Sequence, residues 1–190
     1  IGGVIFMLCG PLTAHIYAGH ITYLNASPWI PIILHFYRLG FLKSNPLYFI
    51  IAGGLSGVQF LTGYSQISLF TFYIVLIFVL YKLFWILKEK EYSKAFNNGL
   101  YLVFSGIVVV LISAVQLIPS LLFSRHSGRS GGVKEEFAST FSLPPENTLS
   151  LLYPNILGDG VNAFSGTNVA YWGRWLSWEI MPYASVLALL

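Results

Sequence analysis

Charged side chains are scarce in this sequence. They make up 9% of the residues, whereas a soluble domain carries about 25%. Hydrophobic residues make up 56%, and a chain this apolar needs a surface that faces lipid. Its apolar runs are long and continuous, unlike the alternating segments of a β-barrel. The composition therefore predicts an all-α, polytopic transmembrane helical bundle.

Several chemical signatures are absent as well. Cys9 is the only cysteine, so no intrachain disulfide can form. The sequence has no P-loop, no G-x-S-x-G motif and no dinucleotide fingerprint. The net charge of +3 is not clustered as in nucleic-acid-binding proteins, and we expect no nucleic-acid partner. No third ligand accompanies the histidines at zinc spacing, so no metal site or cofactor is predicted, although a divalent-metal requirement stays open.

Apolar runs of about 20 residues, the length that crosses a bilayer, divide the sequence. They predict five spans, at 1–18, 21–39, 46–62, 66–87 and 100–123, and the start of a sixth at 183–190. The run 21–39 contains Pro28 and Pro31, and it also fits an interfacial piece followed by a short helix. The chain starts without Met and ends inside an apolar run, so we expect a fragment of a longer protein.

Two further patterns concern packing and orientation. Gly53 and Gly57 form a G-x-x-x-G pair, which predicts the close approach of another helix. Lys88, Lys90 and Lys94 fill the short turn before the fifth span, and such loops mark the cytoplasmic side of a cell membrane. The long loop 124–182 is then extracytoplasmic.

Polar side chains occur where this orientation places span ends outside. They are His20, Asn25, Tyr64 and Gln66. Together with the long loop they predict an outward-facing cavity. His15 is five residues from His20, so the two would not share a helix face well. We interpret His15 as a packing residue and His20 as a candidate binding residue.

The long loop supplies the other candidate substrate-binding residues. It is too aromatic for a disordered linker, and we expect short interfacial helices in it. Pro145 followed by Glu146 predicts a helix start. Glu146 fits a stabilising charge at that helix start and a substrate-binding residue equally well. Arg125 and Arg129 fit either a phosphate site or headgroup anchors. The remaining candidates are Asn147, Trp172, Arg174 and Glu179.

Six stretches of the sequence carry a family resemblance. They are AGH (18–20), WIP (29–31), LTGYSQ (61–66), AVQLIP (114–119), FSLPPEN (141–147) and YPN (153–155). Together they resemble the bacterial YfhO family of multi-pass membrane proteins over nearly the whole chain, with FSLPPEN the most specific part. The chain departs from the family pattern at Tyr64, where the family usually has histidine.

The resemblance implies a glycosyltransferase with the GT-C-type fold. Its donor would be a polyprenyl-phosphate-linked sugar, and its acceptor a cell-envelope polymer such as lipoteichoic acid, on the outer face of the membrane. Such enzymes carry their catalytic acid in the first outer loop, which would precede Ile1, so we name no catalytic residue. The alternative is a non-catalytic transporter or flippase for lipid-linked sugars, and an acid in that upstream loop would favour the enzyme.

Overall fold

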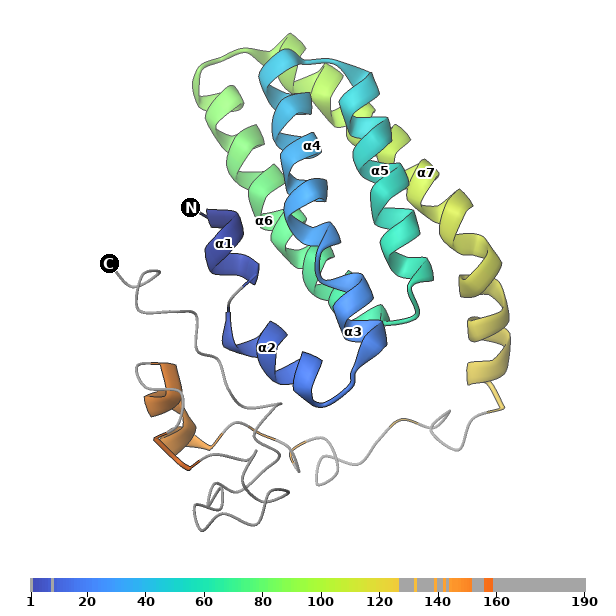
Figure 1. The fold of residues 1–190 in the computed structure, drawn as a ribbon. Helices are drawn as coiled ribbons and strands as arrows, with labels where there is room; N and C mark the ends of the chain where they lie inside the picture. The colour runs from blue at the N-terminus through green and yellow to red at the C-terminus, as the bar shows by residue number, and fades with distance from the viewer. Residues whose placement is uncertain are drawn as a thin grey trace. The chain divides into compact units, whose positions relative to one another are not determined.

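The computed structural model describes residues 2–7, 9–126, 132, 139, 142, 144–151 and 156–158. In these residues the chain forms helices and no strands (Figure 1). It divides into two units, Ile1–Leu24 with Gly131–Leu190, and Asn25–Ser130. The all-α prediction is therefore confirmed for the part of the chain that the structure describes.

The unit Asn25–Ser130 is built on antiparallel helices joined by short turns (Figure 1). Its long helices are α4 (Trp29–Lys43), α5 (Pro46–Leu61), α6 (Ser65–Lys88) and α7 (Tyr92–Ser124). The residues at the start of α5 are suited to beginning a helix. The Asn45 side chain accepts a hydrogen bond from Leu47 N at 2.9 Å. Pro46 lacks a backbone N–H, but an N–H at this first helical position would have no partner within the helix.

Two of these helices, α6 and α7, are long and apolar enough to cross a membrane. At 1.5 Å per residue, α6 is about 36 Å long, which exceeds the roughly 30 Å hydrocarbon core. In each helix 11% of the most apolar stretch is buried, so neither resembles the core helix of a soluble protein. The predicted runs 66–87 and 100–123 fall within them, while the apolar helix α5 is shorter.

The two N-terminal runs are broken into shorter helices. The run 1–18 holds α1 (Gly2–Met7) and α2 (Gly10–Tyr17), and the run 21–39 holds α3 (Ile21–Ala26) and the start of α4. Proline explains both breaks, because Pro11 and Pro28 have no N–H to give to a preceding turn. For 21–39, the structure shows the two-piece alternative rather than one continuous helix.

Phe49 of α5 is the centre of the bundle core. Its side chain is fully buried, and it packs edge-on against Phe41 of α4, with ring centroids 5.2 Å apart. Tyr101 of α7 lies at 5.8 Å on another side of the ring. A Cβ atom at Gly40 would lie 2.8 Å from this ring, so a glycine there lets α4 approach α5.

The closest helix contact in the bundle is between α5 and α7. A Cβ atom at Gly53 would lie 2.5 Å from the Ser105 carbonyl oxygen, and one at Gly57 would lie 2.8 Å from Ile112 Cβ. Real Cβ atoms do not approach so closely. The G-x-x-x-G prediction is therefore confirmed, and α7 is the helix that approaches.

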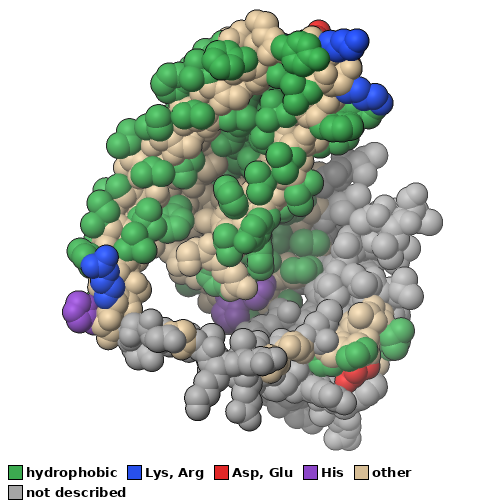
Figure 2. Space-filling view, turned by 180° about the vertical axis from the view of Figure 1, so that it is seen from behind, with side chains coloured by type: hydrophobic (Ala, Val, Ile, Leu, Met, Phe, Trp, Pro, Cys, Tyr) green, Lys and Arg blue, Asp and Glu red, His purple; other side chains and the backbone are tan. Residues whose placement is uncertain are grey.

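Large apolar side chains cover the outside of this unit (Figure 2). On α7, Val115 and Phe123 are each 79% exposed. Exposed apolar area on this scale marks a surface that meets lipid or another protein. It agrees with the membrane assignment of α6 and α7.

In the other unit, η1 (Pro145–Leu151) is a 3-10 helix. The predicted helix start at Pro145 is confirmed, although the helix is tighter than an α-helix. Most of the loop 124–182 and the predicted sixth span at 183–190 lie outside the described residues.

We predict that Gly53→Ala lowers the free energy of unfolding by about 1–3 kcal/mol, because the new methyl group overpacks the α5–α7 contact. Gly54→Ala is the matched control, since a Cβ atom there meets only Ile112 Cδ1, at 3.9 Å. The free energy of unfolding of both variants is measured by reversible unfolding of the full-length protein in mixed detergent. Equal losses in the two would contradict the close contact.

Candidate functional site

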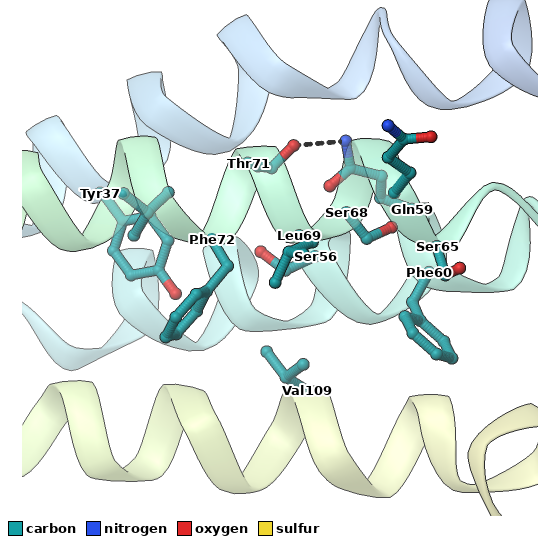
Figure 3. A pocket seen from close by; sticks show the side chains of 12 residues that line it. Tyr37, Ser56, Gln59, Phe60, Ser65, Ser68, Leu69, Thr71, Phe72 and Val109 are labelled. Atoms are coloured by element: carbon teal, nitrogen blue, oxygen red, sulfur yellow. Dashed lines mark hydrogen bonds between the residues drawn. The ribbon is translucent and has the colours of Figure 1, made fainter. Parts of the chain in front are cut away.

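A cavity of about 550 Å³ lies beside α6 within the unit Asn25–Ser130 (Figure 3). It forms because α6 packs less closely on its neighbours than α5 packs on α7. Its lining comes from α4 (Tyr37), α5 (Ser56, Gln59, Phe60), α6 (Ser65, Gln66, Ser68, Leu69, Thr71, Phe72, Val75) and α7 (Val109).

Gln59 is the polar centre of the cavity wall. It is 1% exposed, and its Nε2 donates to the Ala26 carbonyl at 3.0 Å and to Thr71 Oγ1 at 2.8 Å (Figure 3). Thr71 Oγ1 in turn donates to the Ile67 carbonyl at 2.9 Å. One amide therefore joins α3, α5 and α6, and removing it would leave buried acceptors unpaired, at about 1–3 kcal/mol.

Most other polar groups of the wall are paired too. The Tyr37 hydroxyl lies 2.9 Å from Ser105 Oγ, and Ser56 Oγ donates to the Ala52 carbonyl at 2.8 Å. Ser68 differs, because its buried Oγ has no hydrogen-bond partner among the described residues. Its hydroxyl is thus available to a ligand as donor or acceptor.

The cavity suits an apolar or amphipathic molecule. Phe60, Leu69, Phe72, Val75 and Val109 supply its apolar walls, and none of its described lining residues is charged. A mostly apolar pocket with few placed polar groups is the usual form of a small-molecule site.

Two residues predicted from the sequence lie at one end of the cavity. Gln66 lines it, and the Tyr64 hydroxyl donates to Gln66 Oε1 at 3.4 Å, a long and weak contact. Ser65 and Gln66 are both exposed, so they form a polar rim at the N-terminal end of α6. Tyr64 is therefore a neighbour of this rim.

His15 and His20 form a second polar group, in the unit that contains α2. Their Nδ1 atoms are 2.7 Å apart and their ring centroids 4.9 Å apart. The Tyr23 ring covers His15, with ring centroids separated by 3.7 Å. A hydrogen on each Nδ1 would clash at this distance, so only one of the two Nδ1 atoms carries a hydrogen and the other accepts it.

This contact between the histidines was missed from the sequence, because the two were judged as points on one continuous helix, whereas α2 ends before His20. Gly19, at φ +72°, turns the chain, and the His20 N–H donates to the His15 carbonyl at 3.0 Å. Together with the bond from Gly19 N to Ile16 O, this is a Schellman cap, which brings the third-last helical residue against the second residue beyond the cap. His15 is thus half of a pair as well as a buried residue.

None of the remaining candidates that the structure describes is among the residues that line the cavity. Arg125, the C-cap residue of α7, is exposed and does not line it. Glu146 and Asn147 lie in η1 of the other unit, where Asn147 is 1% exposed. Arg129, Trp172, Arg174 and Glu179 lie outside the described residues. Among the described residues no three His, Cys, Asp or Glu side chains group as metal ligands.

Comparison with known proteins gives no match, whether with protein-family models, curated proteins or solved structures. The cavity and the histidine pair therefore have to be interpreted from their own chemistry.

We predict that His15 and His20 adopt opposite tautomers, one with hydrogen on Nδ1 and the other on Nε2. Nitrogen-15 NMR of histidine-labelled full-length protein measures this, with exposed His35 as internal reference. Gly19→Ala should disturb the pair, because a side chain at this positive φ costs about 1–2 kcal/mol.

Gly99→Ala is the control, since a Cβ atom at Gly99 meets nothing within 4 Å. Two identical tautomers in the unchanged protein would contradict the hydrogen-bonded pair.

Proposed function

We propose that this chain belongs to a multi-pass membrane glycosyltransferase that takes its sugar from a polyprenyl-phosphate donor. The observation that carries the proposal is the uncharged cavity beside the long apolar helix α6. An isoprenoid chain needs an apolar slot that can be reached from lipid. The phosphate and sugar need polar groups at the end of that slot.

The cavity has both kinds of wall. Phe60, Leu69 and Phe72 would contact the isoprenoid chain, while Ser65 and Gln66 at the rim would face its polar end. The unpaired Ser68 hydroxyl lies on the same helix, within one turn of both. This order of apolar wall and polar rim supports a lipid-linked donor rather than a free sugar nucleotide.

The reaction would be an inverting transfer at the anomeric carbon. A hydroxyl of the cell-envelope acceptor, such as lipoteichoic acid, forms the new bond to that carbon as the bond to the lipid phosphate breaks. The leaving phosphate keeps the electron pair, and a carboxylate base takes the hydroxyl proton. From the sequence, Arg125, Arg129 and Arg174 are the candidates for stabilising the charge that develops on the phosphate, although Arg125 does not line the cavity.

We predict that Val109→Trp lowers kcat/KM for the lipid-linked donor about 10- to 200-fold, because the indole fills space that the isoprenoid chain would occupy. Val110→Trp is the matched control, since Val110 is 57% exposed and does not line the cavity. Sugar transfer by the full-length protein is measured with both variants. Each activity is divided by the amount of folded protein, and the Tm of each variant confirms that it is folded.

Equal activity of the two tryptophan variants would remove the cavity from donor binding. Movement of the intact lipid-linked sugar across vesicles, with no sugar transferred to acceptor, would instead establish the transporter alternative.

The proposal also requires five spans with the long loop extracytoplasmic. We predict that a cysteine at Thr148 reacts with an impermeant thiol reagent on intact cells, whereas a cysteine at Lys90 reacts only after lysis. Positive residues in short loops are retained on the cytoplasmic side. A Cys9→Ser background removes the native thiol. Labelling only of the cysteine at position 90 in intact cells would show that the membrane orientation is the opposite of the one proposed.

A further inference from the structure

One end of the unit Asn25–Ser130 is strongly basic. The end of α4, the end of α6 and the start of α7 meet there (Figure 1). Six positive residues belong to this end, namely Arg38, Lys43, Lys82, Lys88, Lys90 and Lys94, against two acids, Glu89 and Glu91. Its formal charge is therefore +4, more than the +3 of the whole chain.

A second cavity of about 550 Å³ lies at this end, between the α4–α5 turn and the α6–α7 turn. Each of its described lining side chains carries a polar group. The cavity is open to the surface. Its lining has two lysines (Lys90 and Lys94), one acid (Glu91) and the uncharged residues Ser44, Tyr92, Ser93 and Asn97. The cavity beside α6 has no charged lining residue, so the two cavities suit different chemistry.

Lys90 supplies the uncompensated charge in this second cavity. Lys94 Nζ is already paired with Glu91 Oε2 at 2.7 Å, which leaves those two charges cancelled. Lys90 forms no ion pair with another described residue. The first backbone N–H groups of α7 add to the positive potential, because Glu91 does not cap them with its side chain.

The backbone here is also unusual. Ser44 (φ 46°) and Lys90 (φ 59°) are the two non-glycine residues with positive φ in the described part of the chain, and both line this cavity. At Lys90 the conformation closes a Schellman cap on α6, in which Glu91 N donates to Ile86 O at 3.1 Å. The turn therefore holds the Lys90 backbone in one place beside the cavity.

Two lysines at the ends of α4 and α6 lie over aromatic rings. Lys88 Nζ lies 4.5 Å from the Trp85 ring centroid, and Lys43 Nζ lies 4.9 Å from that of Tyr48. Side chains with an apolar body and a charged tip collect at the headgroup level of a membrane. Lysines over aromatic rings at the end of apolar helices are typical of the headgroup level.

We propose that this cavity binds the phosphate group of an anionic lipid headgroup. Lys90 provides the charge, and Ser44, Ser93 and Asn97 provide hydrogen-bond donors to the phosphate oxygens. The space exceeds that of a bare phosphate, which leaves room for the glycerol part of the lipid. The site is separate from the cavity assigned to the sugar donor and does not depend on that function.

The test is lipid binding by the full-length protein, followed by native mass spectrometry and by the shift in Tm. Phosphatidylglycerol should bind and raise Tm, whereas phosphatidylcholine should do neither. Lys90→Gly should weaken phosphatidylglycerol binding about tenfold, the loss expected for one charged contact. Its Tm without lipid should equal or exceed that of the unchanged protein, because glycine adopts positive φ without strain.

Lys82→Gln is the matched control, because it removes a positive charge from the same end but lies outside the cavity. It should retain phosphatidylglycerol binding. Equal losses in the two variants would show attraction to a basic surface and overturn the site. Inorganic phosphate forms a separate arm, and a Tm shift with phosphate but none with phosphatidylglycerol would overturn the lipid assignment.

Discussion

The contact between α5 and α7 is the constraint on which the rest of the bundle depends. The two helices are held together by close van der Waals packing between their backbones. Gly53 and Gly57 permit that packing, with Ser105 and Ile112 filling the space where side chains would be. Helix α6 packs less closely on either of these two helices than they pack on each other. The cavity beside α6 is the space that results.

Burial also explains why most polar groups of the cavity wall bond to one another or to the backbone. An unpaired polar group costs several kcal/mol in hydrocarbon, roughly. Gln59, Thr71, Tyr37 and Ser105 avoid that cost through mutual or backbone hydrogen bonds. Their pairing turns a wall rich in hydroxyl groups into one that presents mainly carbon to a ligand.

Features that depend on one short segment could be predicted from the sequence. The apolar run 66–87, the glycine pair of α5 and the helix start at Pro145 are all local patterns, and the structure contains each of them. The histidine pair was missed because a spacing of five was judged by the geometry of a continuous helix. Gly19 was the available signal, because a glycine with positive φ ends a helix and turns the next residue back towards its last turn.

The cavity wall depends on which helix faces meet, which one segment alone does not specify. A partial signal exists in α6, where Ser65, Ser68 and Thr71 recur every third residue and so mark one polar face of an apolar helix. No comparable pattern indicated that Gln59 would reach the end of α3. That contact required knowing that the run 21–39 breaks at Pro28.

The hydrogen bond from Gln59 to Ala26 links a break in one helix to a side chain of another. In an unbroken helix the Ala26 carbonyl would accept from Ile30 N, but that N–H donates to Ser27 O at 3.1 Å instead. The glutamine supplies the donor that the break took away. Across related chains the bend and the amide are therefore expected to be inherited as a pair. A lineage that straightens this segment is released from keeping glutamine at position 59.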